Sequence, residues 1–360
     1  YREKTFRLRK RRGVMEIRLL LEEMKRMKAS DLHLVAGVPP AFRVNGEIKY
    51  IGDHSLSPKE VKSIIYSLLD ENQQIIFEKK KDLDFSYGVS GMGRFRVNVH
   101  YQRGTVASAI RCLPEEVPSF EELGLPLPVK DFARQRSGLV LITGPAGSGK
   151  STTLASLVDI INKERSCHIV TIEHPIEYTH SNKKSLIEQR EVYVDTHSFK
   201  SALKHALRQS PDVILIGEMR DTETIETAIT AAETGHLILA TLHTIDASQA
   251  IDRIVDSFTD AKQQQIRSQL SMCLKGVVAQ ILLPKADGEG QVLAAEVMVV
   301  NQAISTAIRN GKTAQIYSSM QTGRTYGMQT MNNALKDLYD RSLVKYEDIL
   351  PYIKERTLIK

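Results

Sequence analysis

The 360-residue sequence has few cysteines and no long apolar segment. Its three cysteines, Cys112, Cys167 and Cys273, are far apart and odd in number, which excludes a CxxC zinc site and favours a reducing compartment. No apolar run reaches the roughly 18 residues that span a bilayer. The basic start leads into a charged amphipathic segment, so we expect no secretory signal. These absences predict a cytoplasmic protein.

The positive charge is confined to the first 14 residues. Residues 1–14 hold seven basic side chains and one acid, which accounts for the whole net charge of +6. The chain from Met15 onward is balanced and shows no basic groove with interleaved aromatics, so we expect no nucleic-acid binding. The basic extension either precedes an alternative start at Met15 or is an arm that contacts a membrane surface or an acidic partner.

The most informative stretch runs from Gly144 to Ser151 and matches the P-loop pattern G-x-x-x-x-G-K-[ST]. A strand, a glycine loop and a helix in this order turn backbone N–H groups and a helix N-terminus toward a phosphate. We expect Lys150 to reach the β- and γ-phosphates of ATP and the Ser151 hydroxyl to ligate Mg²⁺. The predicted nucleotide-binding residues are Gly144, Pro145, Ala146, Gly147, Ser148, Gly149, Lys150, Ser151 and Thr152.

Two domains are expected, separated by a linker. Helical and alternating patterns over residues 15–113 predict a small α+β domain, and four prolines mark residues 114–136 as the linker. Residues 137–360 read as βαβ units, which predict an α/β domain with a parallel sheet, followed by short helices from about residue 301.

Individual elements follow from periodicity and turn signals. In the first domain we predict a helix over Met15–Lys28, a helix capped by Ser57, a hairpin turn at Asn45–Gly46, and strands. The predicted strands of the first domain are 31–35, 41–44 and two or three within 84–111. Those of the second domain are 138–143, 168–172, 212–217 and 237–242.

Acidic residues follow two of the predicted parallel strands. The apolar strand from Asp212 ends at Glu218, at the sheet edge where phosphates gather, as expected for an acid near Mg²⁺. The strand from Ile169 ends in an acidic, proline-containing segment. Either Glu173 or Glu177 is placed there to polarise the attacking water as a general base.

Histidines and arginines are the remaining candidates. His236 and His243 bracket one predicted strand, and a polar group at its end can sense the γ-phosphate; a structural, solvent-facing or metal-binding histidine is the alternative. The nucleotide domain offers no arginine for the transferring phosphate. Arginines cluster instead at Arg94, Arg96, Arg103 and Arg111, where they face solvent or reach the triphosphate from the same chain or an adjacent subunit.

Together these segments resemble the secretion-ATPase superfamily and, within it, the type IV pilus retraction ATPases. The resemblance covers nearly everything from Met15 to the C-terminus. It rests on five segments: residues 30–34 with Pro39, Pro40 and Arg43, the Walker A loop at 144–151, a segment similar to the Asp box at 171–177, the Walker B segment at 217–221, and a segment similar to the His box at 234–244.

The resemblance implies an α/β fold with a RecA-like P-loop ATPase domain and a smaller N-terminal α+β, PAS-like domain. It implies a homohexamer in which ATP turnover rotates one domain against the other. The implied site residues are Glu177 as catalytic glutamate, Glu218 as Walker B acid holding Mg²⁺ partly through water, His236 and His243 as the His-box pair, and Arg96 and Arg111 as arginine fingers.

The implied function is a cytoplasmic motor that hydrolyses ATP and drives pilin disassembly and twitching motility. It would work at the cytoplasmic face of the inner membrane, associating with it through partners, of which a pilus platform protein is the expected one. Two departures stand out: His174 replaces the family's usual Asp, and residues 303–310 match the AIRNLIRE motif of retraction only loosely.

Three alternatives remain at this stage. A pilus-extension or type II secretion ATPase of the same superfamily usually carries a longer N-terminal region and a tetracysteine motif, which the sequence lacks. A RecA-like nucleic-acid motor conflicts with the balanced charge. A scaffold that binds nucleotide without hydrolysing it conflicts with the intact Lys150, Ser151, Glu177 and Glu218.

Overall fold

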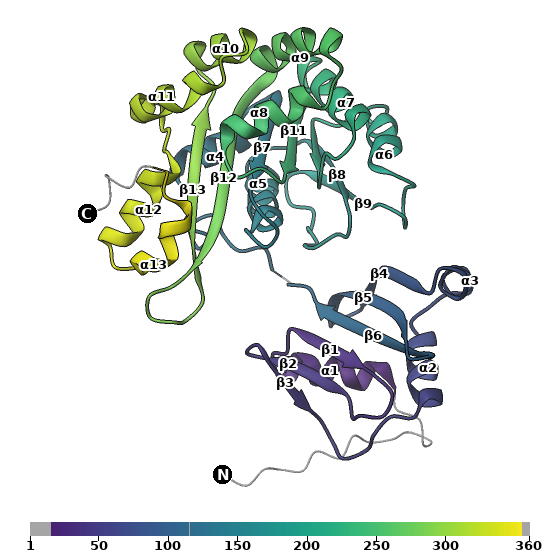
Figure 1. The fold of residues 1–360 in the computed structure, drawn as a ribbon. Coiled ribbons are helices and arrows are strands. Elements are labelled where there is room, and N and C mark those ends of the chain that lie inside the picture. Colours follow the sequence, from purple (N-terminus) through teal and green to yellow (C-terminus); the bar gives the residue numbers. More distant parts are fainter. Residues whose placement is uncertain (1–15, 115, 355–360) are drawn as a thin grey trace. The chain divides into compact units, whose positions relative to one another are not determined.

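The structure, a computed structural model, describes residues 16–114 and 116–354. These residues form two compact units that divide between residues 116 and 117, here called unit 1 and unit 2 (Figure 1). The basic extension over residues 1–14 and the predicted helix start at Met15 lie outside the described residues. Each unit is described by itself.

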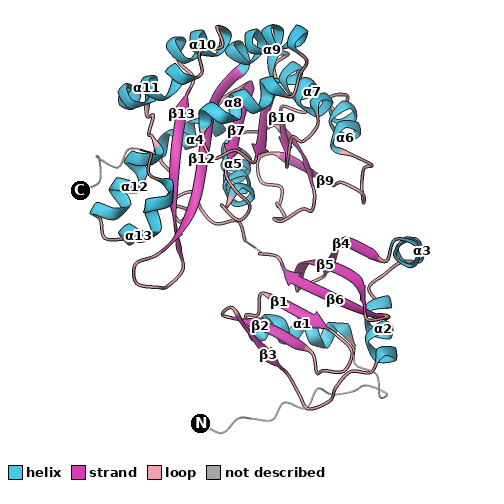
Figure 2. Ribbon diagram, viewed as in Figure 1, coloured by secondary structure: helices cyan, strands magenta, loops and turns pink. Residues whose placement is uncertain are grey.

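Unit 1 is built on a six-stranded antiparallel sheet with the order β3-β2-β1-β6-β5-β4 (Figure 2). The predicted strands and the turn at Asn45–Gly46 are confirmed, and the chain beyond this turn adds β3. The strands are β1 Asp31–Leu34, β2 Ala41–Val44, β3 Glu47–Tyr50, β4 Asp82–Val89, β5 Gly93–Gln102 and β6 Thr105–Cys112.

Three helices complete unit 1: α1 Ile17–Arg26, α2 Pro58–Tyr66 and α3 Glu71–Lys80. Their apolar faces share one core with the sheet, centred on Phe42, Phe77 and Phe95. Helix α2 starts as predicted, because the Ser57 side chain accepts the Glu60 backbone N–H while Glu60 accepts that of Ser57.

Unit 2 is built on a seven-stranded sheet with the order β13-β12-β7-β11-β10-β8-β9. The four predicted strands are confirmed and run parallel, but the sheet is mixed, because β13 pairs antiparallel with β12 as a hairpin at one edge. The strands are β7 Gly138–Thr143, β8 His168–Glu173, β9 Leu186–Glu191, β10 Val213–Ile216, β11 Leu237–Leu242, β12 Leu274–Pro284 and β13 Gln291–Val299.

Helices cover both faces of this sheet, so its central strands are buried on both sides and read as continuous apolar runs. Along β7, Leu139 and Leu141 face one helical layer and Val140 and Ile142 face the other. The first layer is α6 Phe199–Ala206, α7 Thr222–Glu233, α8 Ala247–Asp256, α9 Asp260–Cys273, α10 Gln302–Arg309 and α11 Ala314–Thr322; the second is α4 Leu127–Ala133 and α5 Lys150–Glu164.

The end of the chain is helical, as predicted. Helices α12 Met331–Asp340 and α13 Tyr346–Ile349 pack on the distal part of the β12–β13 hairpin, next to the short 3₁₀ helices η1 Gly323–Tyr326 and η2 Leu350–Tyr352. Helix α4 lies within the stretch predicted as linker. Among the described residues, none of the helices combines the length and the apolar character that crossing a membrane requires.

Candidate active site

The P-loop connects the buried strand β7 to helix α5 at the carboxyl edge of the sheet, as the sequence predicts. Two glycines shape it. Gly149 has φ +84° and immediately precedes Lys150, the first residue of α5. A Cβ atom on Gly144 would lie 2.3 Å from the backbone oxygen of Gln280 and 2.5 Å from Ser148 Oγ. The loop is thus tightly packed against β12. Within the loop the Ser148 backbone N–H donates to the backbone oxygen of Pro145 at 3.3 Å, and the N-terminus of α5 that follows favours an anion such as phosphate.

Gln280 is a site residue that the sequence analysis missed. It lies on β12, one residue beyond Ala279, which pairs with Thr143 at the end of β7. Its buried amide Nε2 donates to the backbone oxygen of Ser148 at 2.6 Å. This hydrogen bond fixes the loop from a residue that lies 132 positions later in the sequence, so only the β7–β12 pairing reveals it.

Several buried polar atoms around the loop lack hydrogen-bond partners in the described part of the chain: Thr143 Oγ1, Ser148 Oγ and Gln280 Oε1. Unpaired buried polar groups are costly, and they commonly mark a site completed by a ligand or by ordered water. The positive φ of the loop glycines and these unpaired atoms together fit a bound phosphate chain.

Lys150 points back onto its own loop. Its Nζ donates to the backbone oxygens of Gly144 at 2.9 Å and Pro145 at 2.8 Å. Burial lowers the pKa of Lys150, while the charges of Glu218 and Glu177 act in the opposite direction. The ammonium is therefore held at the loop by neutral carbonyls, ready to exchange them for phosphate oxygens.

The next two residues of α5 differ in how their hydroxyls are used. Thr152 Oγ1 lies 3.0 Å from the hydroxyl of Tyr178, which ties α5 to the segment that carries Glu177. Among the described residues, no hydrogen bond engages the Ser151 hydroxyl, which is half-buried. Ser151 is thus the free oxygen of this turn, as a Mg²⁺ ligand requires.

The sequence left Glu173 and Glu177 as alternatives for the general base, and the structure shows that their surroundings differ. Glu173 is enclosed: its Oε1 accepts from Thr171 at 2.6 Å and from Gln189 at 3.2 Å. Burial raises the pKa of Glu173 to about 7; the two hydrogen bonds oppose this shift, and the nearby charges of Glu177 and Glu191 add to it.

Glu177 is half-buried, and no partner for its carboxylate is found within the described ranges. The residues on either side of it are anchored, because Ile176 donates its backbone N–H to Glu191 at 3.3 Å and the backbone oxygen of Tyr178 accepts from Gln189 at 2.8 Å. The negative charge of Glu177 acts to raise the pKa of Lys150, so this carboxylate interacts electrostatically with the lysine of the phosphate loop.

Glu218 follows β10 and carries two cationic or potentially cationic partners. Arg220 Nε lies 2.6 Å and His243 Nε2 lies 3.3 Å from the same oxygen, Oε1. Burial raises the pKa of Glu218, but the hydrogen bond and charge of Arg220, with those of His243, outweigh it and lower the pKa overall. The helix cap at this turn is Asp221, which accepts the Thr224 backbone N–H at 2.8 Å, so Glu218 is not consumed as a cap.

These oxygens suit a hard divalent cation. Ser151 offers a hydroxyl that no hydrogen bond engages in the described residues, and Glu218 offers a carboxylate whose lowered pKa favours the ionised form. No group of three or more His, Cys, Asp or Glu side chains able to hold a metal occurs within residues 16–114 and 116–354. Mg²⁺ bound through nucleotide phosphates needs only one or two protein oxygens, so the donor set fits it.

The two histidines lie at opposite ends of β11. His243 follows the strand and reaches Glu218, as described above. His236 precedes Leu237, which pairs with Gly138 at the start of β7, and its Nδ1 lies 3.0 Å from the backbone oxygen of Ala231. The structure thus brings His243 to the phosphate edge and leaves His236 at the opposite edge of the same sheet.

Of the arginine candidates, Arg96 and Arg111 lie exposed on strands β5 and β6 of unit 1, whereas Arg103 lies in the turn between these strands. Arg96 and Arg111 pair directly across β5 and β6, and Arg111 in turn pairs with Asp31 on β1. Arg111 Nε donates to Asp31 at 2.8 Å, and Arg96 Nε lies 3.9 Å from Asp84. Their role as arginine fingers remains a proposal. Unit 2 itself contributes an arginine that the sequence analysis overlooked, Arg220.

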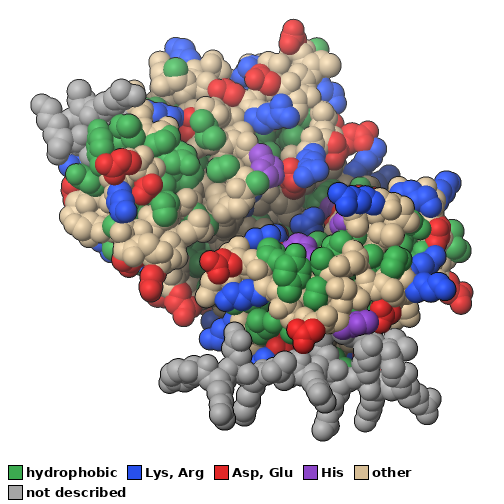
Figure 3. All heavy atoms as spheres, turned by 60° about the horizontal axis from the view of Figure 1, so that its bottom comes forward, with side chains coloured by type: hydrophobic (Ala, Val, Ile, Leu, Met, Phe, Trp, Pro, Cys, Tyr) green, Lys and Arg blue, Asp and Glu red, His purple; other side chains and the backbone are tan. Residues whose placement is uncertain are grey.

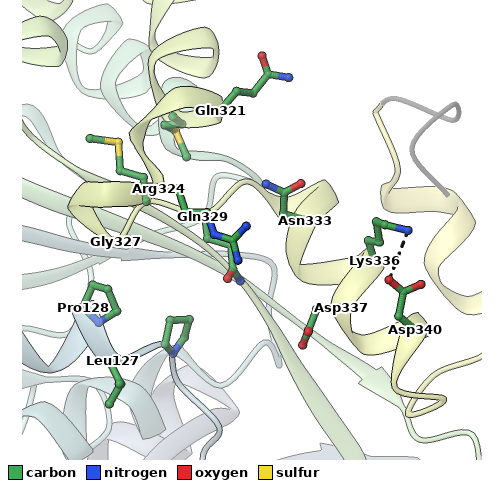
Figure 4. A pocket seen from close by; sticks show the side chains of 13 residues that line it. Leu127, Pro128, Gln321, Arg324, Gly327, Gln329, Asn333, Lys336, Asp337 and Asp340 are labelled. Atoms are coloured by element: carbon green, nitrogen blue, oxygen red, sulfur yellow. Dashed lines mark ion pairs between the residues drawn. The ribbon is translucent and has the colours of Figure 1, made fainter.

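A separate hollow of about 930 Å³ lies in unit 2, between the start of α4, the α11–η1 segment and α12 (Figure 4). Arg324 lines it together with Lys336 and Asp340, which form an ion pair of 3.3 Å. None of the predicted site residues lines this hollow. On the face of the molecule drawn in Figure 3, basic and acidic side chains occur on both units.

Comparison with known proteins places the chain among molecular motors. The family model described as type II/IV secretion system protein matches residues 14–350. PilT of Pseudomonas aeruginosa, named as a type IV pilus retraction ATPase, is 46% identical over 334 residues, which is 93% of this chain and 97% of that protein. A twitching motility protein of Neisseria gonorrhoeae is 44% identical over 87% of this chain and 84% of its own.

The crystal structure of a pilus retraction motor PilT with bound ADP superimposes with a TM-score of 0.90. It is 49% identical and covers 95% of this chain and 98% of its own. The likeness therefore extends over both units and includes an adenine-nucleotide complex of the similar protein.

Proposed function

The chain belongs to the type II/IV secretion system protein family as a PilT-like ATPase that powers pilus retraction and twitching motility, and on this basis we propose that it works as a Mg²⁺-dependent homohexamer. The observation that supports the site assignment is the P-loop of unit 2, where Lys150 is held by backbone carbonyls near two carboxylates, Glu177 and Glu218. ATP is the substrate.

In this proposal the loop N–H groups and Lys150 bind the β- and γ-phosphates and stabilise the charge that develops on the transferring group. Glu177, which has no competing partner among the described residues, orients the attacking water and accepts its proton. Ser151 and Glu218 would hold Mg²⁺, which neutralises phosphate charge. His243, in contact with Glu218, is placed to respond to loss of the γ-phosphate.

Arg96 and Arg111 are proposed as the arginine fingers, and the hexamer as the assembly in which they act. We propose that the motor works at the cytoplasmic face of the inner membrane and acts on the pilus platform protein there. Differential affinity of each domain arrangement for ATP and ADP is what converts turnover into motion.

Glu177→Gln tests the assignment of the base, with Glu173→Gln as the matched control from the same segment. We expect Glu177→Gln to lower phosphate release on the order of a hundredfold or more while fluorescent ATP analogues still bind, because only the proton acceptor is lost. Glu173→Gln should remain within a few-fold of wild type. The opposite ranking would assign the base to Glu173 instead.

Deletion of the gene in its host tests the direction of the motor. Abundant surface pili without twitching are expected, since retraction removes pilin. Cells without surface pili would instead support the hypothesis of a pilus-extension ATPase with the same catalytic site.

A further inference from the structure

Arg220 lies in the turn between β10 and α7 and carries a contact that the fold itself does not require. Its side chain is 75% exposed, yet its Nε lies 2.6 Å from Glu218 Oε1. An exposed ion pair usually adds little to stability, about 0–1 kcal/mol. The importance of this contact therefore lies in its effect on the Glu218 carboxylate.

The backbone of this turn is held without Arg220. The Gly217 backbone N–H donates to Ile172 at 2.8 Å and the Met219 backbone N–H donates to Thr241 at 3.2 Å. The Thr241 hydroxyl donates to the backbone oxygen of Gly217. On the other side of Arg220, Asp221 caps α7. Arg220 thus adds nothing that the turn lacks, and what it fixes is the carboxylate.

A glutamate side chain has three rotatable bonds, so its carboxylate is imprecisely placed unless neighbours restrain it. Arg220 and His243 approach the same oxygen, Oε1, from two different segments, the β10–α7 turn and the end of β11. Two partners from separate segments restrain the carboxylate more than either partner alone would.

We propose that Arg220 is a positioning residue of the ATPase site, which together with His243 fixes the orientation of the Glu218 carboxylate. The inference rests on the proposed function of Glu218. Arg220 acts through the carboxylate, and its removal leaves Glu218 with the histidine alone. Such supporting residues typically change metal affinity or activity by about 10–100-fold when removed.

The experiment compares Arg220→Ala with Arg341→Ala in the full chain. Arg341 is a matched control, because it is 62% exposed and pairs with Asp337 at 3.1 Å on α12. Arg220→Ala should lower kcat about tenfold and leave KM for ATP within about threefold, whereas Arg341→Ala should match wild type. Arg220→Lys, which keeps a positive donor, should recover part of the loss.

Two further measurements separate positioning from a merely structural effect. In a Glu218→Gln background, Arg220→Ala should cost less than twofold, because the group it positions is already altered. Without turnover, the gain in affinity for a fluorescent ADP analogue on adding Mg²⁺ should fall about tenfold in Arg220→Ala, with the Mg²⁺-free affinity unchanged.

Equal kcat values for Arg220→Ala and Arg341→Ala would overturn the inference, as would additive losses with Glu218→Gln. Loss of Mg²⁺-free ADP binding in Arg220→Ala would also overturn it, because the residue would then support the fold or the nucleotide itself. The wild-type protein separates this result from the proposed function: if wild type releases no phosphate, the proposed function fails before any variant is compared.

Discussion

At the amino edge of the unit 2 sheet, two polar side chains bond to the backbone. Asp212 accepts the His168 backbone N–H at 2.8 Å, and His236 Nδ1 lies 3.0 Å from the backbone oxygen of Ala231. At the carboxyl edge, Lys150 contacts only neutral carbonyls, and the hydroxyl of Ser148 is buried without a partner in the described residues. Polar side chains thus bond to the local backbone at the amino edge, whereas the P-loop groups Lys150 and Ser148 at the carboxyl edge remain available for a ligand.

The difference follows from parallel strands. Their carboxyl ends lead into loops before helix N-termini, where backbone N–H groups have no partner within the helix and attract anions. The amino ends follow helix C-termini, where the chain turns back and side chains bond to the last carbonyls. The carboxyl edge is therefore distinguished by P-loop groups that are free to bind a ligand.

Removal of the available cation should give the largest effect. Lys150→Ala is expected to lower kcat/KM for ATP at least about a hundredfold, because a charged contact to the phosphates is lost. Lys163→Ala is the control, since this lysine lies on the same helix but pairs with Asp159 at 2.7 Å. Steady-state phosphate release checks both variants. Similar losses in the two would mean that α5 is sensitive to substitution in general, and that the loop contact is not special.

The two histidines test the two edges with one residue type. His243→Ala should lower kcat about tenfold, because it removes one of the two groups that contact Glu218. His236→Ala should lower kcat less than threefold and act mainly through the thermal midpoint, since its ring contact is to the local backbone. Parallel ATPase and thermal unfolding measurements check this. A larger loss of kcat in His236→Ala would contradict the contrast between the edges.

The sequence predicted the P-loop and Glu218 better than the strands that pack around them. The pattern around Gly144–Ser151 predicts β7, the loop and α5, because local geometry and phosphate chemistry demand those residues in that order. The position of Glu218 at a strand end follows from the apolar run before it. Both features depend on residues that are adjacent in the sequence, so the sequence pattern is enough to predict them.

What the sequence did not predict depends on pairing over long distances. Gln280 reaches the loop only because β12 adds to β7, and no local signal marks a glutamine in an apolar strand as a loop partner. The mixed sheet arises from the same hairpin. Arg220 stands inside a motif that was recognised, but its contact with Glu218 depends on the geometry of the turn. The resemblance grouped His236 with His243, but the pairing of β11 with β7 places the two histidines at opposite edges of the sheet.

Glu173 sharpens the comparison, because it lies at the carboxyl edge but is already bonded, to Thr171 and Gln189. If availability is decisive, this acid should affect stability rather than activity. Its pKa rises from 4.5 to about 7 on folding, so between these values the folded state holds a proton that the unfolded state has lost. The free energy of unfolding should therefore fall as pH rises through this window and level off above it.

Glu173→Gln should remove this contribution, because the amide carries no titrating proton. We expect the difference in unfolding free energy between wild type and Glu173→Gln to change by up to about 3 kcal/mol across the window. Urea unfolding of both proteins at a series of pH values measures it. A difference that stays constant with pH would show that Glu173 does not hold the proton. A matching loss of kcat in the variant would show that position at the edge, and not availability, decides function.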